Sequence, residues 1–190
     1  MNDGFTYKIN QARLSLLQGD ITRQATDAIV NAANSGLMGG GGVDGAIHRA
    51  GGSTILEECK QIVARQGRLP TGQAVITTAG DMPAKHVVHT VGPVWHGGSR
   101  GEPELLASAY RESLKVAAAN NLASVSFPSI STGVYGYPVD LAADIALREV
   151  VSFLAQPTPV KEVFFVLYDS RTFEAYAGAL RQIIKEKDKI

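Results

Sequence analysis

The sequence has little of what marks secreted or membrane-bound proteins. Cys59 is the single cysteine among 190 residues, so the chain cannot form an internal disulfide, which suits a reducing compartment. No stretch reaches the roughly eighteen consecutive apolar residues that a membrane helix needs, and the first residues carry no apolar leader segment. We therefore expect a cytoplasmic protein with no membrane partner.

An excess of charge of one sign is also missing. The 18 Lys and Arg residues balance the 18 Asp and Glu residues, and the basic residues are scattered along the chain. Surfaces that bind nucleic-acid polymers gather positive charge, because their affinity depends on ion pairs with phosphates. The composition gives no strong sign of such a partner.

The length and the hydrophobic content indicate one globular unit. With 190 residues and 45% hydrophobic residues, the chain can bury one sizeable core. We expect a single domain over residues 1–190, with its core at about 12–187 and an N-terminal extension at 1–11. No internal repeat or linker divides it.

Short apolar and β-branched runs alternate with amphipathic segments. One such segment places Ile55, Cys59 and Ile62 on one face of a helix. This alternation predicts an α/β sandwich, with a mostly parallel central sheet and helices on both faces. Strands are expected at residues 12–17, 28–30, 74–78, 86–91, 124–130 and 163–168, and helices at 54–65, 104–120, 141–154 and 172–186.

Three turn-like segments each follow an expected strand, at 19–22, 31–45 and 131–136. Parallel strands would bring them to the same edge of the sheet, where ligands bind in such folds. Four consecutive glycines at 39–42 let the backbone approach a ligand and offer N–H groups to a phosphate. Because 39–45 and 131–136 contain no Lys or Arg, backbone amides and a helix N-terminus near Val43 would hold the phosphates. That favours a small nucleotide.

Each polar residue of these segments also has a simpler interpretation. Asp20 can cap a short helix at 21–24, and Asp44 can cap the helix that begins near Gly45. Asn31 and Asn34 can be turn residues that bond their own backbone. Capping and turns, however, explain neither the four glycines nor the second Gly-rich loop.

Two other chemistries fit the sequence less well. Gly40, Gly42 and Gly45 match the dinucleotide pattern G-x-G-x-x-G, but the loop is not the first strand-to-helix turn, and no acidic residue ends a second strand about twenty positions later. His86 and His89 stand three apart in an expected strand, which points them to opposite faces and disfavours a shared metal site. We expect no metal and no cofactor.

Five motifs in order carry a resemblance to a known family: GDIT, VNAAN, GGGGVDGAIH, HTVGP and SISTGVYGYP. Together they resemble the macrodomain family, in particular its MacroD-like branch and the bacterial enzymes that deacetylate O-acetyl-ADP-ribose or remove mono-ADP-ribose. The resemblance runs from about Arg13 to the last expected helix. It implies a three-layer α/β/α fold, a six-stranded mixed sheet and a cleft for ADP-ribose.

The resemblance also implies roles for residues at the two ends of that ligand. Asp20 is similar to the aspartate that accepts a hydrogen bond from the adenine amino group, with the Ile21 backbone beside it. Tyr168 resembles the aromatic residue that stacks on adenine, although it can also be read as a core aromatic. Asn34 and Asp44 resemble the catalytic pair that positions the distal ribose and a water molecule.

Between these ends, two loops resemble the walls that grip the diphosphate. The residues implied are Gly41, Gly42, Val43, Ser131, Thr132, Gly133, Val134, Tyr135 and Gly136. Family members that only read ADP-ribose commonly lack the Asp44 equivalent, so its presence favours turnover.

The function implied is a metal-independent hydrolase that cleaves ester bonds to the distal ribose. Its partners would be ADP-ribose, the O-acetyl ester and proteins carrying mono-ADP-ribose on Asp or Glu. The main alternative is a non-catalytic module that reads ADP-ribose or regulates another protein. A third possible function is the removal of ADP-ribose from nucleic-acid ends, which the neutral net charge of the chain does not exclude.

Overall fold

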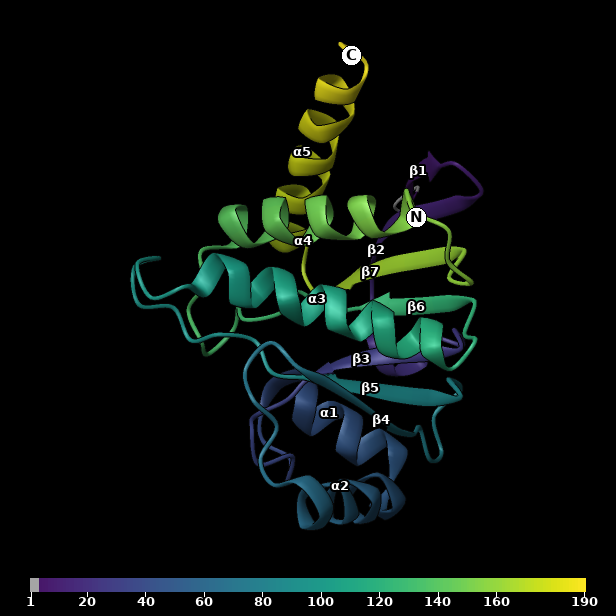
Figure 1. Cartoon of the computed structure of the whole chain (residues 1–190), viewed down its shortest axis with the longest axis vertical. Helices are drawn as coiled ribbons and strands as arrows, with labels where there is room; N and C mark the ends of the chain where they lie inside the picture. The colour runs from purple at the N-terminus through teal and green to yellow at the C-terminus, as the bar shows by residue number, and fades with distance from the viewer. Residues whose placement is uncertain (1–3) are drawn as a thin grey trace.

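The computed structural model describes residues 4–190, in which the strands form a single mixed sheet of order β1-β2-β7-β6-β3-β5-β4 (Figure 1). The five central strands of this order, from β2 to β5, are parallel, and β1 and β4 add antiparallel edges. The strands are β1 (Phe5–Ile9), β2 (Ala12–Gln18), β3 (Ala28–Ala32), β4 (Ala74–Thr78), β5 (His86–Thr90), β6 (Ser124–Phe127) and β7 (Glu162–Leu167).

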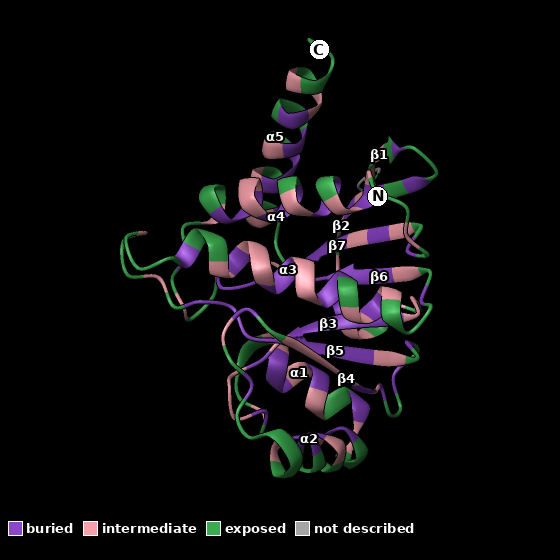
Figure 2. Cartoon of the chain, viewed as in Figure 1, coloured by how far each residue is buried: buried purple, intermediate pink, exposed green. Residues whose placement is uncertain are grey.

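Helices cover both faces of this sheet, which confirms the predicted three-layer α/β sandwich. The core on one face joins the sheet to α3, α4 and α5, and the core on the other joins it to α1 and α2 (Figure 1). The central strands lie between the two cores and are largely buried (Figure 2). The helices are α1 (Gly42–Gly51), α2 (Ser53–Gln66), α3 (Glu102–Ala119), α4 (Val139–Leu154) and α5 (Ser170–Lys187), with a 3-10 turn, η1 (Ile21–Arg23).

The sheet has seven strands where six were expected. The additional strand is β1, which lies in the segment expected to be an N-terminal extension and pairs with β2 from Phe5 opposite Leu16 to Ile9 opposite Ala12. Its Thr6 and Lys8 are exposed, as on an edge strand with one solvated face. The alternation is short and mixed with polar residues, which is why the sequence pattern did not reveal it.

The other elements start and end close to their expected bounds. The strand expected at 124–130 ends at Phe127, because Pro128 has no N–H to donate to a neighbouring strand. Within residues 4–190, no helix combines the length and the apolar character needed to cross a bilayer.

Candidate functional site

The parallel strands bring the predicted site segments to one edge of the sheet. Because β2, β7, β6 and β3 are adjacent and parallel, their carboxyl ends lie side by side in that order. Asp20 follows β2, Tyr168 follows β7, the 131–136 loop follows β6, and Asn34 follows β3. The expected convergence of these segments is confirmed. Along the edge they follow one another in the order Asp20, Tyr168, the 131–136 loop and Asn34.

Asp20 caps η1, as its simpler interpretation predicted. Its Oδ1 accepts hydrogen bonds from the Thr22 backbone N–H at 2.9 Å and from the Thr22 hydroxyl at 2.7 Å. The Thr22 hydroxyl and then the Thr22 amide hold the pKa of this carboxyl below its ordinary value. The other oxygen, Oδ2, lies 3.9 Å from Arg23 Nε and has no hydrogen bond within residues 4–190. One oxygen of Asp20 is therefore structural, and the other is available to a ligand.

Tyr168 stands in solvent rather than in the core. It directly follows β7 and is 85% exposed. The alternative of a strand-end core aromatic is wrong. A tyrosine ring this exposed next to the Asp20 segment offers a flat apolar surface on which a base can stack.

The glycine loop opens onto the N-terminus of α1. Gly41 is the N-cap, no side chain caps this helix, and a Cβ added at Gly41 or Gly42 would meet no atom within 4 Å. Gly42 has a φ of +57°, a conformation that favours glycine. The first N–H groups of α1 are therefore free to bind an anion. Asp44 lies within the first turn, so its interpretation as the N-cap is wrong.

The 131–136 loop is the second Gly-rich segment at this edge of the sheet. It is closed by hydrogen bonds from the Tyr137 N–H to the Ser131 carbonyl and from the Gly136 N–H to the Gly133 carbonyl, both 3.0 Å. Gly133 has open space at its Cβ position, and Val134 is fully exposed. The loop is thus held at its base and presents its tip to solvent.

The segment around Trp95 contacts this loop and holds it in place. The Trp95 N–H donates to the Tyr135 carbonyl at 2.9 Å, and the Trp95 ring packs on Tyr137 with centroids 4.6 Å apart. Glu102 in turn accepts hydrogen bonds from the backbone N–H groups of residues 96, 98 and 100. Burial alone would raise the pKa of Glu102, but these amides outweigh it and lower the pKa to about 2. The carboxylate therefore fixes the loop at 96–100.

Asp44 is a buried carboxylate at the far end of the edge. Its Oδ1 accepts a hydrogen bond from Asn31 Nδ2 at 2.7 Å and lies 3.4 Å from His48 Nε2. A Cβ built on Gly40, which is exposed, would lie 3.2 Å from Asp44 Oδ2 and 3.5 Å from Asn34 Nδ2. Asp44 Oδ2 and the Asn34 amide therefore border the same accessible space above Gly40, as expected for a pair that acts together.

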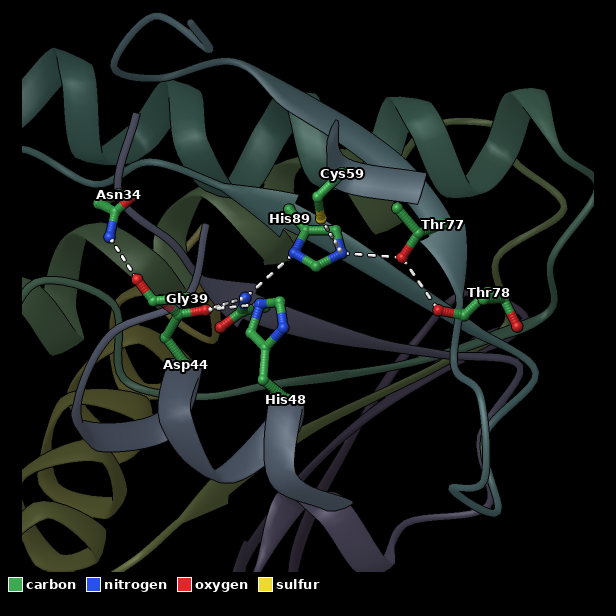
Figure 3. A network of polar contacts seen from close by, with 9 residues as sticks. Asn34, Gly39, Asp44, His48, Cys59, Thr77, Thr78 and His89 are labelled. Carbon is green, nitrogen blue, oxygen red and sulfur yellow. Dashed lines mark hydrogen bonds and ion pairs between the residues drawn. The ribbon is translucent and has the colours of Figure 1, made fainter. Parts of the chain in front are cut away.

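Asn34 also has a structural task. Its Nδ2 donates to the Gly39 carbonyl at 3.0 Å, which fixes the start of the glycine loop (Figure 3). This bond agrees with its interpretation as a turn residue.

The interpretation of Asn31 as a turn residue is wrong, because Asn31 is buried within β3, and the sequence did not reveal which residues lie next to Asp44. His48, Asn31 and His89 all lie within one polar network with it, in which the rings of His48 and His89 are 6.3 Å apart (Figure 3). The i, i+4 spacing of Asp44 and His48 on a helix was a signal that places both on one face. The pairing of Asn31 with His89 across β3 and β5 had no signal in the sequence, because it depends on strand order.

The remaining titratable groups show no metal centre. Within residues 4–190, no three His, Cys, Asp or Glu side chains are grouped so that they could hold an ion. Burial, followed by the charges of Asp44 and Glu58, raises the pKa of Cys59 to about 11, so this thiol is a poor nucleophile.

Comparison with known proteins agrees with this geometry. The Macro domain family model matches residues 30–146. A Klebsiella pneumoniae protein named O-acetyl-ADP-ribose deacetylase is 58% identical over 165 residues, which cover 87% of this chain and 94% of that protein. A macrodomain of Oceanobacillus iheyensis solved with ADP has a TM-score of 0.93 and 42% identity, over 97% of this chain and 98% of that one. A Trypanosoma brucei macrodomain in complex with ADP-ribose has a TM-score of 0.80 and 39% identity, over 88% of this chain and 68% of that one.

Proposed function

This chain belongs to the macrodomain family, and from that membership we propose that it binds ADP-ribose and hydrolyses the ester bond of O-acetyl-ADP-ribose. The observation that carries the proposal is the Asp44 carboxylate, which is buried and held on Oδ1 while Oδ2 borders the accessible space beside Asn34. A binding module has no need of a fixed, buried carboxylate next to a diphosphate, whose like charge it repels.

The order of the segments along the sheet edge supports one orientation of the ligand. Adenine would stack on Tyr168 and donate its amino group to Asp20 Oδ2, with the Ile21 backbone beside it. The diphosphate would lie between the α1 N-terminus and the 131–136 loop, where exposed N–H groups offset its charge. The distal ribose would then reach Asn34 and Asp44.

These wall residues keep the roles that the family resemblance implied. Gly41, Gly42 and Val43 would bind from the helix side, and the opposite wall would comprise Ser131, Thr132, Gly133, Val134, Tyr135 and Gly136. Exposed glycines at Gly41 and Gly133 support this proposal, because each leaves room for a phosphate beside the backbone.

The proposed reaction is a hydrolysis with Asp44 as the base. Asp44 takes a proton from a water molecule as the water oxygen forms a bond to the acetyl carbonyl carbon. The bond between that carbon and the ribose oxygen then breaks, the ribose oxygen takes the proton back from Asp44, and ADP-ribose leaves together with acetic acid, which ionises to acetate. The two loops contribute by fixing the ester next to the water, so proximity supplies much of the rate.

Asn34 would orient the ribose and the water, because its amide nitrogen borders the same space above Gly40 as Asp44 Oδ2. The same geometry would accept an ester of the distal ribose with a protein Asp or Glu side chain, so mono-ADP-ribosylated proteins are proposed as further substrates. Their leaving groups would extend out of the cleft beyond the exposed Gly40.

The test is a single-turnover assay with O-acetyl-ADP-ribose and a glutamate-modified protein. We expect the wild type to hydrolyse the acetyl ester, and Asp44→Ala to lose about 10²–10⁴-fold in rate, the range for a lost general base. Asp44→Asn is the matched variant, because its Oδ1 still accepts from Asn31 while the base is removed; it should be as slow. EDTA should leave the wild-type rate unchanged.

The dissociation constant for ADP-ribose separates the alternatives. We expect all three proteins to bind, because the diphosphate contacts are backbone amides that neither substitution removes. If all bind and none hydrolyses either ester, the chain is a reader and the proposed activity is wrong. If Asp44→Asn turns over at the wild-type rate, the base lies elsewhere.

A further inference from the structure

A chain of buried polar groups runs from Asp44 across the face of the sheet that α1 and α2 cover, from β3 over β5 to the edge strand β4. Asn31 Nδ2 lies 2.7 Å from Asp44 Oδ1 and 3.0 Å from His89 Nδ1, and His89 Nε2 lies 2.8 Å from Thr77 Oγ1 (Figure 3). Thr77 on β4, His89 on β5 and Asn31 on β3 are all buried. Buried polar groups are costly unless they are paired, so a chain of this length beneath the site calls for an explanation.

The direction of every hydrogen bond in this chain is determined by its two ends. The Asp44 carboxylate can only accept, so Asn31 turns its Nδ2 to it and also to His89 Nδ1. Thr77 Oγ1 then accepts from His89 and gives its own proton to the Thr78 carbonyl at 2.9 Å. The proton of His89 is therefore on Nε2, and Nδ1 is left as an acceptor.

Asn31 must then present its amide nitrogen to both neighbours. One N–H donates to His89 Nδ1 and the other to the carboxylate of Asp44, while Asn31 Oδ1 has no hydrogen-bond partner within residues 4–190. If the amide were flipped, its oxygen would face both a carboxylate oxygen and an unprotonated ring nitrogen. His89 and Asp44 thus hold this amide in one of its two orientations.

Burial and, to a smaller extent, the neighbouring His48 lower the pKa of His89 to about 3. The ring is therefore neutral throughout the physiological range. It cannot act as an acid or a base for a ligand, because it is fully buried behind Asn31. The neutral His89 ring can, however, stay in a single tautomer and so present a fixed donor and a fixed acceptor to its neighbours.

We propose that Thr77, His89 and Asn31 form a positioning relay for Asp44, in which the hydroxyl on β4 selects the His89 tautomer and that tautomer fixes the amide that orients the carboxylate. The relay gives the proposed base a fixed direction toward the space above Gly40. This inference rests on the proposed function, and it adds buried residues that lie behind the proposed base.

Thr77 offers the cleanest test because it is farthest from the cleft. Thr77→Val removes only the hydroxyl and keeps the side-chain shape. His89 then keeps only the weak contact of Nε2 with Cys59 Sγ at 3.9 Å, its proton can move to Nδ1, and the Asn31 amide meets a donor where it needs an acceptor. We expect kcat to fall about 10- to 100-fold, since misplacing a catalytic group by a fraction of an ångström has effects of this size.

The Michaelis constant and the ADP-ribose dissociation constant should change less than about threefold, because the relay does not reach the diphosphate walls. Thr77→Ser is the matched control: it retains the hydroxyl and should restore most of the wild-type kcat. If Thr77→Val folds and keeps the wild-type kcat, or if Thr77→Ser is as slow as Thr77→Val, the relay is wrong.

A second measurement needs neither activity nor a variant that folds. In wild-type protein with ¹⁵N-labelled histidine, long-range NMR correlations should show His89 as a neutral ring with its proton on Nε2 from about pH 5 to 8. A proton on Nδ1, or a charged ring at pH 6, would overturn the relay. If this signature is found but the wild type hydrolyses no ester offered, the proposed function fails and the assignment of the network stands.

Discussion

The two ends of the site are built differently. At the inner end, Asp44 is buried, and its neighbour Asn31 is bonded in turn to the buried His89. At the outer end, Tyr168 is 85% exposed, and Asp20 has one oxygen with no hydrogen-bond partner within residues 4–190. At the inner end the carboxylate is held by a buried amide, whereas the outer end presents an exposed ring and a carboxylate oxygen whose ion pair with Arg23 is 3.9 Å long.

This difference indicates a division of labour. A group that does chemistry must be held in place before the reaction, since reorganising it during the reaction costs free energy. A group that only contributes binding can remain exposed until the ligand covers it. We therefore expect substitutions at the inner end to lower the rate at nearly constant affinity, and those at the diphosphate walls and the outer end to lower the affinity at nearly constant rate.

The largest effect on affinity is expected at the helix-side wall. Gly41→Glu would place a carboxylate beside the diphosphate, and like charges at a desolvated contact cost several kcal/mol, so ADP-ribose affinity should fall at least about 100-fold. The backbone tolerates the change, because Gly41 has a φ of −92° and open space at its Cβ position. Isothermal titration calorimetry with ADP-ribose measures the affinities of the variant and the wild type.

Gly41→Gln is the matched control, with nearly the same shape and no charge. It should bind clearly more tightly than Gly41→Glu. Equal affinities for the two variants would mean that the diphosphate does not lie here. A wild-type affinity that falls steeply with salt would instead assign the phosphate contact to a cation such as Arg23 or Arg171.

The next largest effect is expected at Asp20. Asp20→Asn keeps an oxygen that can cap η1 but replaces the ligand-facing oxygen by a donor, which should weaken ADP-ribose binding by about 1.5–3 kcal/mol, the range for a hydrogen bond to a charged group. Guanine has a carbonyl where adenine has its amino group, so the same variant should bind GDP-ribose better than the wild type does. Calorimetry with both nucleotides checks this.

The outcome at Asp20 also bears on the comparison of the two ends. The turnover rate of Asp20→Asn at saturating substrate should equal that of the wild type. An unchanged ADP-ribose affinity in Asp20→Asn would reduce Asp20 to a helix cap, and a fall in kcat would show that the two ends are not independent.

The smallest effect is expected at Tyr168. Tyr168→Ala should weaken ADP-ribose binding by about 1–3 kcal/mol, the range for stacking of a base on an aromatic ring. Tyr168→Phe keeps the ring and should bind within about twofold of the wild type. Because the side chain is 85% exposed, neither variant should change the melting temperature noticeably, which a thermal scan of the ligand-free proteins can confirm. If Tyr168→Ala and Tyr168→Phe bind ADP-ribose with equal affinity, Tyr168 does not contact the ligand.

Local patterns in the sequence determined most of the fold. Runs such as the one that became β4 are bounded by turn residues, and the spacing of Ile55, Cys59 and Ile62 gave α2 almost to the residue. The glycine loop and the 131–136 loop could be placed at one sheet edge, because parallel strands end on the same side. The roles of Asp20, Asn34 and Asp44 came from family resemblance, not from spacing.

Tertiary structure alone decided which strand residues lie behind Asp44. His89 is opposite Asn31 only because β5 pairs with β3, and Thr77 reaches His89 only because β4 is antiparallel to β5. These partners are separated by 12 to 58 residues in the chain. Strand order and register fix such contacts, and a local pattern of residues carries neither. The sequence by itself determined the segments that meet a ligand, and the packing of the sheet determined which buried groups hold the carboxylate among them.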